Sequence, residues 1–589
     1  MSYQAPVRDI IFSLFNEAHF DRLFENNQAG LDAELVTSIL DEAGKFSSEV
    51  IAPISWTGDQ KKAYLDDTGV HVPQEFINAY QQLVEGGWPT LAASEEYGGQ
   101  GLPLSLSNAV YDMLNSNIAF TLCPMLSNGA VEALTAHADK DMQEKYLPKL
   151  ISGEWSGTMN LTEPQAGSDV GALKSKAEPV GDGSYKIKGT KIYITYGDHD
   201  MSENIMHLVL ARLPDAPAGT KGLSLFLVPK ILVNDDGSLG QSNDLKCIGL
   251  EEKLGIHASP TCVMSFGDAG GATGYLIGAE NKGMAAMFTM MNNARLHVGL
   301  QGVGVAECAT QLAMNYARER KQSRAFDAAP TDHEPISIEG HPDVKRMLLT
   351  MRSLTDAARA ICYENGVLHD LAHQNNDVEA KAFNDLLTPI SKAFSTDIAN
   401  EVAAIGVQVH GGMGFVEETG AAQHVRDARI LTIYEGTNGI QAIDLIGRKL
   451  PLDNGGVVNR YIDQMQATAE SCLAEQDGIF QHMGQALTTA LTDVRQATDW
   501  MLDAQMPQAD KMAGATAYLR LFSLAAGGHY LLRGALAAKQ NQNGDFAHRK
   551  ISVARFYAGN LLTDIAALTQ SVMQGGACLA DIDVTSLSA

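Results

Sequence analysis

The spacing of apolar residues changes twice along the chain, and this limits the folds that the chain can adopt. From about residue 32 to 151 the spacing is mostly helical. Between about 154 and 278 apolar residues alternate with polar ones, as in residues 185–195, which is typical of half-buried strands. Helical spacing returns from about 283 to 448. The pattern predicts a helical unit, a β domain of roughly 120 residues and a second helical unit, in that order.

A further helical unit follows. Residues 451–456 read Pro-Leu-Asp-Asn-Gly-Gly, which is typical of a linker. Beyond them Leu487, Leu491 and Val494 fall on one face of a helix. A chain of 589 residues has room for three or four domains at ~100–200 residues each. We therefore expect a mostly α fold with a central β domain, divided into an N-terminal helical domain (1–153), a middle β domain (154–280), a helical bundle (281–450) and a C-terminal helical extension (451–589).

The acidic composition argues against two kinds of partner. The chain carries 43 basic and 70 acidic side chains, a net charge of −27. This charge repels phosphate backbones and anionic lipid head groups, so nucleic acid is not an expected partner. No stretch reaches the ~18 uninterrupted apolar residues of a membrane helix, and we expect no membrane span.

The cysteines indicate a reducing compartment. There are seven, widely separated and without a C-x-x-C pair, which fits neither a disulfide framework nor a zinc site. The first residues lack the basic region and apolar run of a secretion signal. We expect free thiols and a cytoplasmic location.

Several common catalytic motifs are missing from the chain. It contains no G-x-S-x-G elbow, no G-x-x-x-x-G-K-[ST] phosphate loop and no H-E-x-x-H pair, so hydrolase, NTPase and zinc protease activities have no support. The sixteen histidines lack the spacing of metal ligands, and we expect no metal site. His410, among apolar residues and glycines, is expected to be a structural histidine.

Three short segments contain residue types that are typical of ligand-binding or catalytic sites. Residues 159–169 combine hydroxyls, glycine and carboxylates at the start of the β domain, where they could hold a phosphate or the edge of a flavin, or form a simple turn. Residues 408–415 contain three glycines, which allow a bulky ligand to approach the backbone or end a helix in a tight loop. Residues 433–441 place Glu435 between an aromatic residue and a glycine, as a candidate base or a solvated surface glutamate.

Together, in this order, the three segments resemble the acyl-CoA dehydrogenase family, and the resemblance spans residues from about 30 to 450. Three further stretches carry it: residues 94–101 (Ser-Glu-Glu-Tyr-Gly-Gly-Gln-Gly), 191–195 (Lys-Ile-Tyr-Ile-Thr) and 319–326 (Glu-Arg-Lys-Gln-Ser-Arg-Ala-Phe). The α–β–α order of the units is also the order in this family. The resemblance implies that the chain uses FAD to oxidise an acyl-CoA thioester to a trans-2-enoyl-CoA.

The resemblance also implies which residues hold the cofactor. Tyr193 stands where the family usually has Trp, and Gly439 stands where a polar side chain that contacts FAD is common. Arg320 would reach the FAD of a neighbouring subunit, which implies a homo-oligomer, either a dimer or a tetramer. The expected FAD-binding residues are Met159, Leu161, Thr162, Gly167, Ser168, Tyr193, Thr195, Arg320, Gln408, Gly412 and Thr437.

In this family, the oxidation removes one proton and one hydride from the acyl group. Hydride must go to the flavin, because no protein side chain accepts it, and the α-proton needs a base. Glu435 occupies the position of that base, and a dry acyl slot would raise its pKa towards ~6–7. Donors for the enolate oxygen would be its own backbone N–H and a ribityl hydroxyl of FAD. The expected substrate-binding residues are Ser168, Arg295, Tyr434 and Gly436, and Arg295 has a solvent-exposed helix position as its alternative.

The motifs do not identify the substrate or the electron acceptor. The added N-terminal segment, the long loop after Phe326 and the extension resemble a bacterial subgroup that includes 3-methylmercaptopropionyl-CoA dehydrogenases. Short or medium acyl chains, with electron-transferring flavoprotein as the acceptor, are the first expectation. The alternatives are a long-chain enzyme, an acyl-CoA oxidase and a DNA-associated flavoprotein. The last would need a basic face, whereas residues 451–589 hold 9 basic and 13 acidic side chains, net −4.

Overall fold

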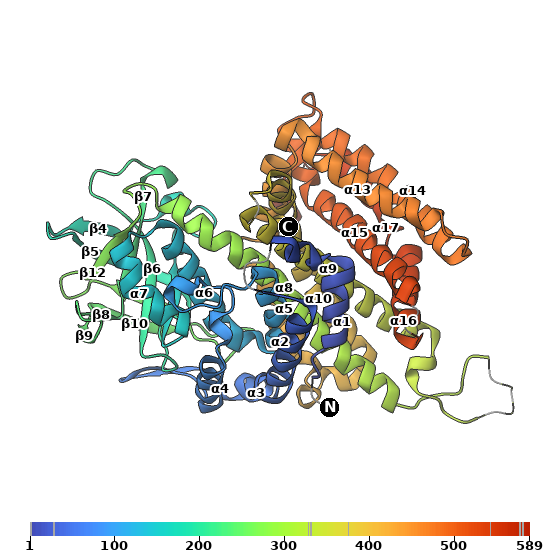
Figure 1. Cartoon of the computed structure of the whole chain (residues 1–589), viewed down its shortest axis with the longest axis horizontal. Helices are drawn as coiled ribbons and strands as arrows, with labels where there is room; N and C mark the ends of the chain where they lie inside the picture. Colours follow the sequence, from blue (N-terminus) through green and yellow to red (C-terminus); the bar gives the residue numbers. More distant parts are fainter. Residues whose placement is uncertain are drawn as a thin grey trace.

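A computed structural model shows three bodies in a row, with the β domain at one end, the long helices in the middle and the C-terminal helices at the other end (Figure 1). The structure describes residues 3–26, 30–327, 329, 331, 333–374, 376–541, 544–576, 579 and 582–588. Within these residues, none of the helices combines the length and the apolar character needed to span a bilayer.

The N-terminal domain is a set of helices with one small hairpin. Asp32 begins α2 by accepting a hydrogen bond from the backbone N–H of Leu35, as expected of an N-cap. Between α3 and α4 the antiparallel strands β1 (Tyr64–Asp66) and β2 (Gly69–His71) interrupt the helices, which the helical spacing did not predict. The helices are α1 (Val7–Phe12), α2 (Ala33–Phe46), α3 (Pro53–Lys61), α4 (Gln74–Glu85), α5 (Leu104–Leu114), α6 (Ile118–His137) and α7 (Lys140–Ser152).

The β domain is built on one eight-stranded sheet. Its strand order is β10-β11-β5-β12-β7-β6-β3, and β4 pairs with β5 and β6. The alternating run predicted over residues 185–195 is confirmed as β5. The strands are β3 (Trp155–Asn160), β4 (Lys176–Pro179), β5 (Ser184–Thr195), β6 (Asn204–Arg212), β7 (Leu223–Pro229), β8 (Ile231–Val233), β9 (Leu239–Ser242), β10 (Leu245–Leu250), β11 (Thr261–Phe266) and β12 (Ala272–Ile277).

Three long helices form the centre of the molecule: α8 (Gly283–Glu319), α9 (Pro342–Gln374) and α10 (Val378–His410). They bury apolar residues around much of their circumference, as expected of helices inside a large core. Two short helices follow: α11 (Ala421–Ala428), which contacts α8 and α10, and α12 (Asn438–Asp444), which contacts α10 and the extension. The segment that contains Glu435 lies between them.

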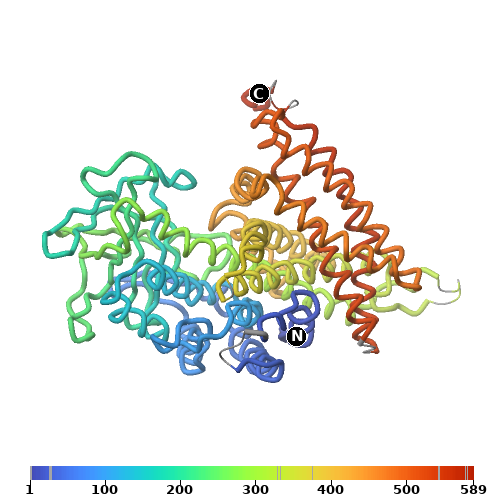
Figure 2. Tube along the Cα trace, turned by 45° about the horizontal axis from the view of Figure 1, so that its top comes forward, coloured from blue at the N-terminus to red at the C-terminus, as the bar shows by residue number. Residues whose placement is uncertain are grey.

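The extension is an antiparallel set of helices that lies along one side of the central bundle (Figure 2). The predicted face is confirmed, because Leu487, Leu491 and Val494 on α14 are buried. Helices α15 and α16 contact α9 of the bundle. The helices are α13 (Gly456–Leu473), α14 (Gly478–Leu502), α15 (Gln508–Asn541), α16 (Gly544–Asn560) and α17 (Asp564–Gln574).

Polar groups also hold the extension to the rest of the chain. Lys550 of α16 is buried, and its Nζ lies 2.9 Å from Asp9 of α1 and 3.3 Å from Asp356 of α9. Six cysteines are free thiols, and the seventh, Cys578, lies outside the described residues. Over the described ranges, no three His, Cys, Asp or Glu side chains are arranged to hold a metal ion.

Candidate active site

Glu435 sits in a tight segment just before α12. Its φ is +56° and that of Gly436 is +84°, so two successive residues adopt the left-handed conformation. For a glutamate this conformation costs energy, and such strain is found mainly at functional sites. The segment is held by Gln441, whose Nε2 donates to the carbonyl oxygens of Glu435 and Gly436 at 3.3 and 3.4 Å. Thr437 caps α12 by accepting from the N–H of Ile440.

The carboxylate of Glu435 lies in a dry environment. Its Oε2 is buried and has no hydrogen-bond partner in the described part of the chain. Burial raises the pKa of Glu435 to about 7, against the opposing effects of the cations Arg295 and Lys392. A carboxylate that titrates near neutral pH is well matched to proton abstraction. The alternative of a solvated surface glutamate is wrong.

Arg295 is buried close to this base. It lies on α8, only 5% of it is exposed, and its Nη1 is 3.3 Å from Oδ2 of Asp444. Arg448 reaches the other oxygen of Asp444 at 2.7 Å. The alternative of a solvent-exposed helix position for Arg295 is therefore wrong. The structure places its charge next to Glu435, and a contact with CoA stays a prediction.

A row of buried polar side chains on α8 begins at the Tyr434 hydroxyl. The Tyr434 hydroxyl donates to Oε1 of Gln301, and His297 and Asn293 follow at intervals of four residues, on the same helix face. All three α8 residues are at least nine-tenths buried, yet Gln301 Nε2, His297 Nε2 and Asn293 Oδ1 have no partner among the described residues. Glu132 of α6 accepts from Asn293, and burial raises the pKa of Glu132 to about 7.

Residues 159–169, the segment expected to hold the flavin, are anchored to β5 by a buried ion pair. Lys191 Nζ lies 2.9 Å from Glu163 and also donates to the carbonyl oxygen of Leu161 at 3.0 Å. Burial alone would raise the pKa of Glu163, but Lys191 and hydrogen bonds from Ser175 and Lys174 outweigh it and lower the pKa to about 2. The segment after β3 is therefore held in one position.

A bulge in β5 exposes an aromatic ring beside this segment. Two residues of β5, Ile192 and Tyr193, lie opposite one residue of β11, and the freed N–H of Ile192 donates to the carbonyl oxygen of Thr162 at 2.9 Å. Tyr193 has φ +60° and is 59% exposed. Of the other residues predicted here, Met159, Leu161, Thr162 and Thr195 are half-buried, whereas Gly167 and Ser168 are exposed.

The remaining predicted cofactor residues lie at the far ends of the bundle helices. Tyr316 of α8 stacks on His410 of α10 at 4.4 Å, which brings the end that carries Arg320 near the end that carries Gln408. Arg320, Gln408 and Gly412 are all exposed. Exposed apolar side chains flank them: Phe326 (90%), Phe415 (89%) and Met413 (48%). The structure thus gathers the predicted residues into three groups, around Glu435, around Tyr193 and at these helix ends.

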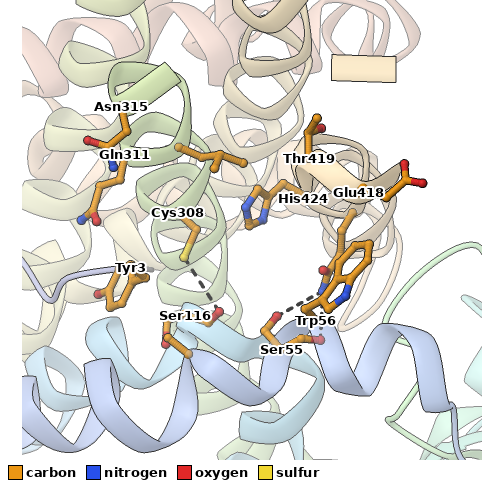
Figure 3. Close-up of a pocket in the computed structure, with 14 residues that line it drawn as sticks. Tyr3, Ser55, Trp56, Ser116, Cys308, Gln311, Asn315, Glu418, Thr419 and His424 are labelled. Carbon is orange, nitrogen blue, oxygen red and sulfur yellow. Dashed lines mark hydrogen bonds between the residues drawn. The ribbon is translucent and has the colours of Figure 1, made fainter. Parts of the chain in front are cut away.

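A pocket of about 280 Å³ lies elsewhere, between α3, α8 and α11. Figure 3 shows Trp56, Cys308 and His424 around it, with Tyr3 at one side. None of the residues predicted from the sequence to bind cofactor or substrate lines this pocket. The candidate site is therefore located by its motifs and by the environment of Glu435 and not by this hollow.

Sequence profiles of known families match all four units of the chain. The N-terminal, middle and C-terminal domains of acyl-CoA dehydrogenase match residues 35–154, 158–269 and 281–450. A domain described as acetyl-CoA dehydrogenase C-terminal like matches residues 461–583. The chain belongs to the acyl-CoA dehydrogenase family. The expected fold class is confirmed, and the reaction class is FAD-dependent acyl-CoA dehydrogenation.

Individual relatives match nearly the whole chain. The chain is 45% identical to 3-methylmercaptopropionyl-CoA dehydrogenase of Ruegeria pomeroyi, over 96% of this chain and 97% of the relative. It is 34% identical to a butyryl-CoA dehydrogenase of Syntrophomonas wolfei, over 96% of each. A Bacillus anthracis acyl-CoA dehydrogenase complexed with FAD has the same fold, with a TM-score of 0.73 and 20% identity over 100% of this chain and 94% of that one.

The residues present suit FAD. The exposed Tyr193 ring and the firmly anchored backbone at Leu161 and Thr162 offer a flat, rigid surface for a ring system. Gly167 and Gly412 have open space where a side chain would start, so a ligand can approach their backbone. The buried, unpartnered carboxylate oxygen of Glu435 suits a reacting carbon acid.

Sequence reasoning missed several residues that shape the site. The motifs did not predict the Glu163–Lys191 ion pair, Gln441 or Lys392, although Glu163 lies within residues 159–169 and Lys191 within residues 191–195. Lys392 carried one usable signal, because it is a lone lysine in the apolar run 386–394 of a predicted helix.

Proposed function

We propose that Glu435 is the general base that removes the α-proton of the acyl-CoA thioester. The observation that carries this proposal is the buried carboxylate with a pKa raised to about 7. FAD, when bound, accepts the hydride that leaves the β-carbon. As the α-C–H bond breaks, its proton goes to the Glu435 carboxylate and its electron pair enters the new carbon–carbon double bond.

The backbone of the same residue suits the developing enolate. The N–H of Glu435 donates to no group in the described part of the chain, so it is available to the thioester carbonyl oxygen. A donor held by a rigid, strained segment costs no reorganisation when charge develops. Removal of the base by Glu435→Gln, measured as anaerobic bleaching of the flavin by substrate, tests the proposal directly.

We infer that the acyl group is short and carries a heteroatom, as 3-methylmercaptopropionyl-CoA does. Gln301 Nε2 and His297 Nε2, which are buried on α8 without a partner in the described residues, support this, because a thioether sulfur is a weak hydrogen-bond acceptor and a methylene is not. Identity of 45% to a 3-methylmercaptopropionyl-CoA dehydrogenase points the same way.

Two thioesters of equal length test the acyl preference. 3-(Methylthio)propionyl-CoA and pentanoyl-CoA differ only by sulfur in place of a methylene. We expect a higher kcat/KM for the thioether, and a reduced preference in His297→Leu. A preference for pentanoyl-CoA that the variant does not change would contradict the inference and would leave the role of Glu435 untouched.

We also propose that the chain works as a homo-oligomer in the cytoplasm and passes electrons to an electron-transferring flavoprotein. The exposed apolar side chains Phe326, Phe415 and Met413 beside Arg320 support a second subunit at this surface, because exposed apolar patches favour association. Sedimentation of the holoenzyme measures the oligomer. Reoxidation in air, compared with reoxidation by the flavoprotein, separates a dehydrogenase from an oxidase.

A further inference from the structure

Lys392 is a buried lysine on α10. It is 0% exposed, and among the described residues no carboxylate oxygen lies within 4.0 Å of its Nζ. A lysine is almost never fully buried unless it is paired, because leaving water costs its charge several kcal/mol. Within the described residues, its Nζ donates to Oδ1 of Asn438 at 2.8 Å. A costly arrangement of this kind needs a function.

Asn438 links this lysine to the strained segment that contains Glu435 and Gly436. It is the first residue of α12 and lies three positions after Glu435. Its Nδ2 donates to Oδ1 of Asp397 at 2.7 Å and to Oγ1 of Thr396 at 3.0 Å, and contacts the carbonyl oxygen of Ala393 at 3.1 Å. In the described part of the chain, the hydrogen-bond partners of the Asn438 side chain all belong to α10. The strained segment is therefore fastened to α10 at the end that follows the base.

Four charged groups surround the base in this region. Arg295 on α8 and Lys392 on α10 are the cations that act on Glu435, while Asp397 on α10 and Asp444 on α12 are carboxylates that act on these cations. Burial lowers the pKa of Lys392 to about 7, although Glu435 and Asp397 oppose this. Since Arg295 is paired with Asp444, Lys392 is the cation that lacks its own carboxylate.

We propose that Lys392 is a positioning residue for the base, which holds the Glu435 segment through Asn438 and, as a cation, favours the ionised Glu435 carboxylate. This proposal rests on the proposed role of Glu435. It has two separable parts, a geometric part that needs a donor to Asn438 and an electrostatic part that needs a positive charge.

The test compares the pH profiles of kcat/KM for four holoenzymes: wild type, Lys392→Met, Lys392→Arg and Asn438→Ala, with FAD content measured for each. In Lys392→Met, kcat/KM should fall, and the fall at pH 6 should exceed that at pH 9 by ~10-fold, equivalent to one pKa unit of the base. Lys392→Arg should restore the shape of the profile because it keeps the charge. Asn438→Ala should lower kcat with a profile parallel to that of the wild type.

Lys449→Met is the matched control. The Lys449 side chain is 20% exposed, but it has a carboxylate partner, Asp385, at 3.3 Å, and among the described residues no hydrogen bond or ion pair joins it to residues 434–438. Its profile should coincide with that of the wild type.

If Lys392→Met keeps the wild-type profile and rate, or changes no more than Lys449→Met, the inference is wrong. If Lys392→Met fails to fold, the other two variants still decide the inference: a wild-type kcat in Asn438→Ala contradicts the geometric part, and a pH profile of Lys392→Arg that differs in shape from that of the wild type contradicts the electrostatic part. A parallel Glu435→Gln enzyme separates the two proposals, because activity in that variant refutes the base itself.

Discussion

Replacement of Lys550 by methionine should loosen the C-terminal extension from the rest of the molecule. Lys550 lies on α16 with its side chain 4% exposed, and it joins Asp9 of α1 to Asp356 of α9. Glu17 adds a third nearby carboxylate, and together these groups raise the pKa of Lys550 in spite of its burial. This ammonium stabilises the fold below its unfolded pKa, and the stabilisation is lost as pH rises through the higher folded pKa.

The expected loss of stability follows from the carboxylates that remain when the lysine is removed. Breaking a buried ion pair by removing one partner costs ~3–5 kcal/mol, because a buried charge remains uncompensated. Here Asp9 keeps Arg549 at 2.9 Å and Asp356 keeps Arg352 at 2.9 Å, so we expect a loss near the lower limit, about 3 kcal/mol. The double variant Lys550→Met/Asp9→Asn should recover part of this loss, because one uncompensated carboxylate is gone.

Thermal unfolding of the holoenzyme, followed by circular dichroism, measures the effect. The control is Arg495→Met, because Arg495 pairs with Asp463 at 2.6 Å on the exposed surface of the extension, and such pairs contribute ~0–1 kcal/mol. The first transition should fall clearly in Lys550→Met and hardly at all in the control. Equal shifts in the two variants would refute the argument that buried charge, and not surface charge, fastens the extension.

Three further outcomes are expected. Arg320→Ala should weaken FAD retention and the oligomer together, by the ~1.5–3 kcal/mol of a charge-assisted phosphate contact, and unchanged FAD content after dialysis with an unchanged sedimentation profile would count against it. A chain that ends near Asp453 should aggregate or dissociate, because the truncation exposes apolar surface. At ~25 cal/mol per Å², even a few hundred Å² of newly exposed apolar surface is worth several kcal/mol. A soluble, active, FAD-containing truncation would show that the extension is an independent appendage. Finally, kcat/KM should rise with pH through about 7, since Glu435 abstracts a proton only when ionised and its pKa is raised to about 7, and a flat profile between pH 5.5 and 8.5 would exclude this pKa for the base.

The sequence predicted the order of the units because hydrophobic spacing reports local geometry. The alternating residues 185–195 form β5, and the helix face that carries Leu487 and Leu491 is the buried side of α14. The β1–β2 hairpin was missed because three-residue strands are too short to show a period. Long, repetitive elements were therefore predictable, and brief ones were not.

For the site, motif resemblance located Glu435, but its surroundings depend on residues far apart in the chain. Arg295 and Lys392 reach the base from two different helices, 140 and 43 positions away, and no local pattern predicts that they meet there. The solvent-exposed position considered for Arg295 was wrong for this reason, since its partner Asp444 lies 149 positions further along. Tertiary packing decides which charges come together.

Glu435 is proposed to remove the α-proton, and anaerobic stopped-flow of Glu435→Gln with an acyl-CoA tests this role. The variant should retain FAD and bind the thioester, while flavin bleaching slows by at least the ~10²–10⁴-fold typical of a general base. Bleaching at close to the wild-type rate would contradict this role.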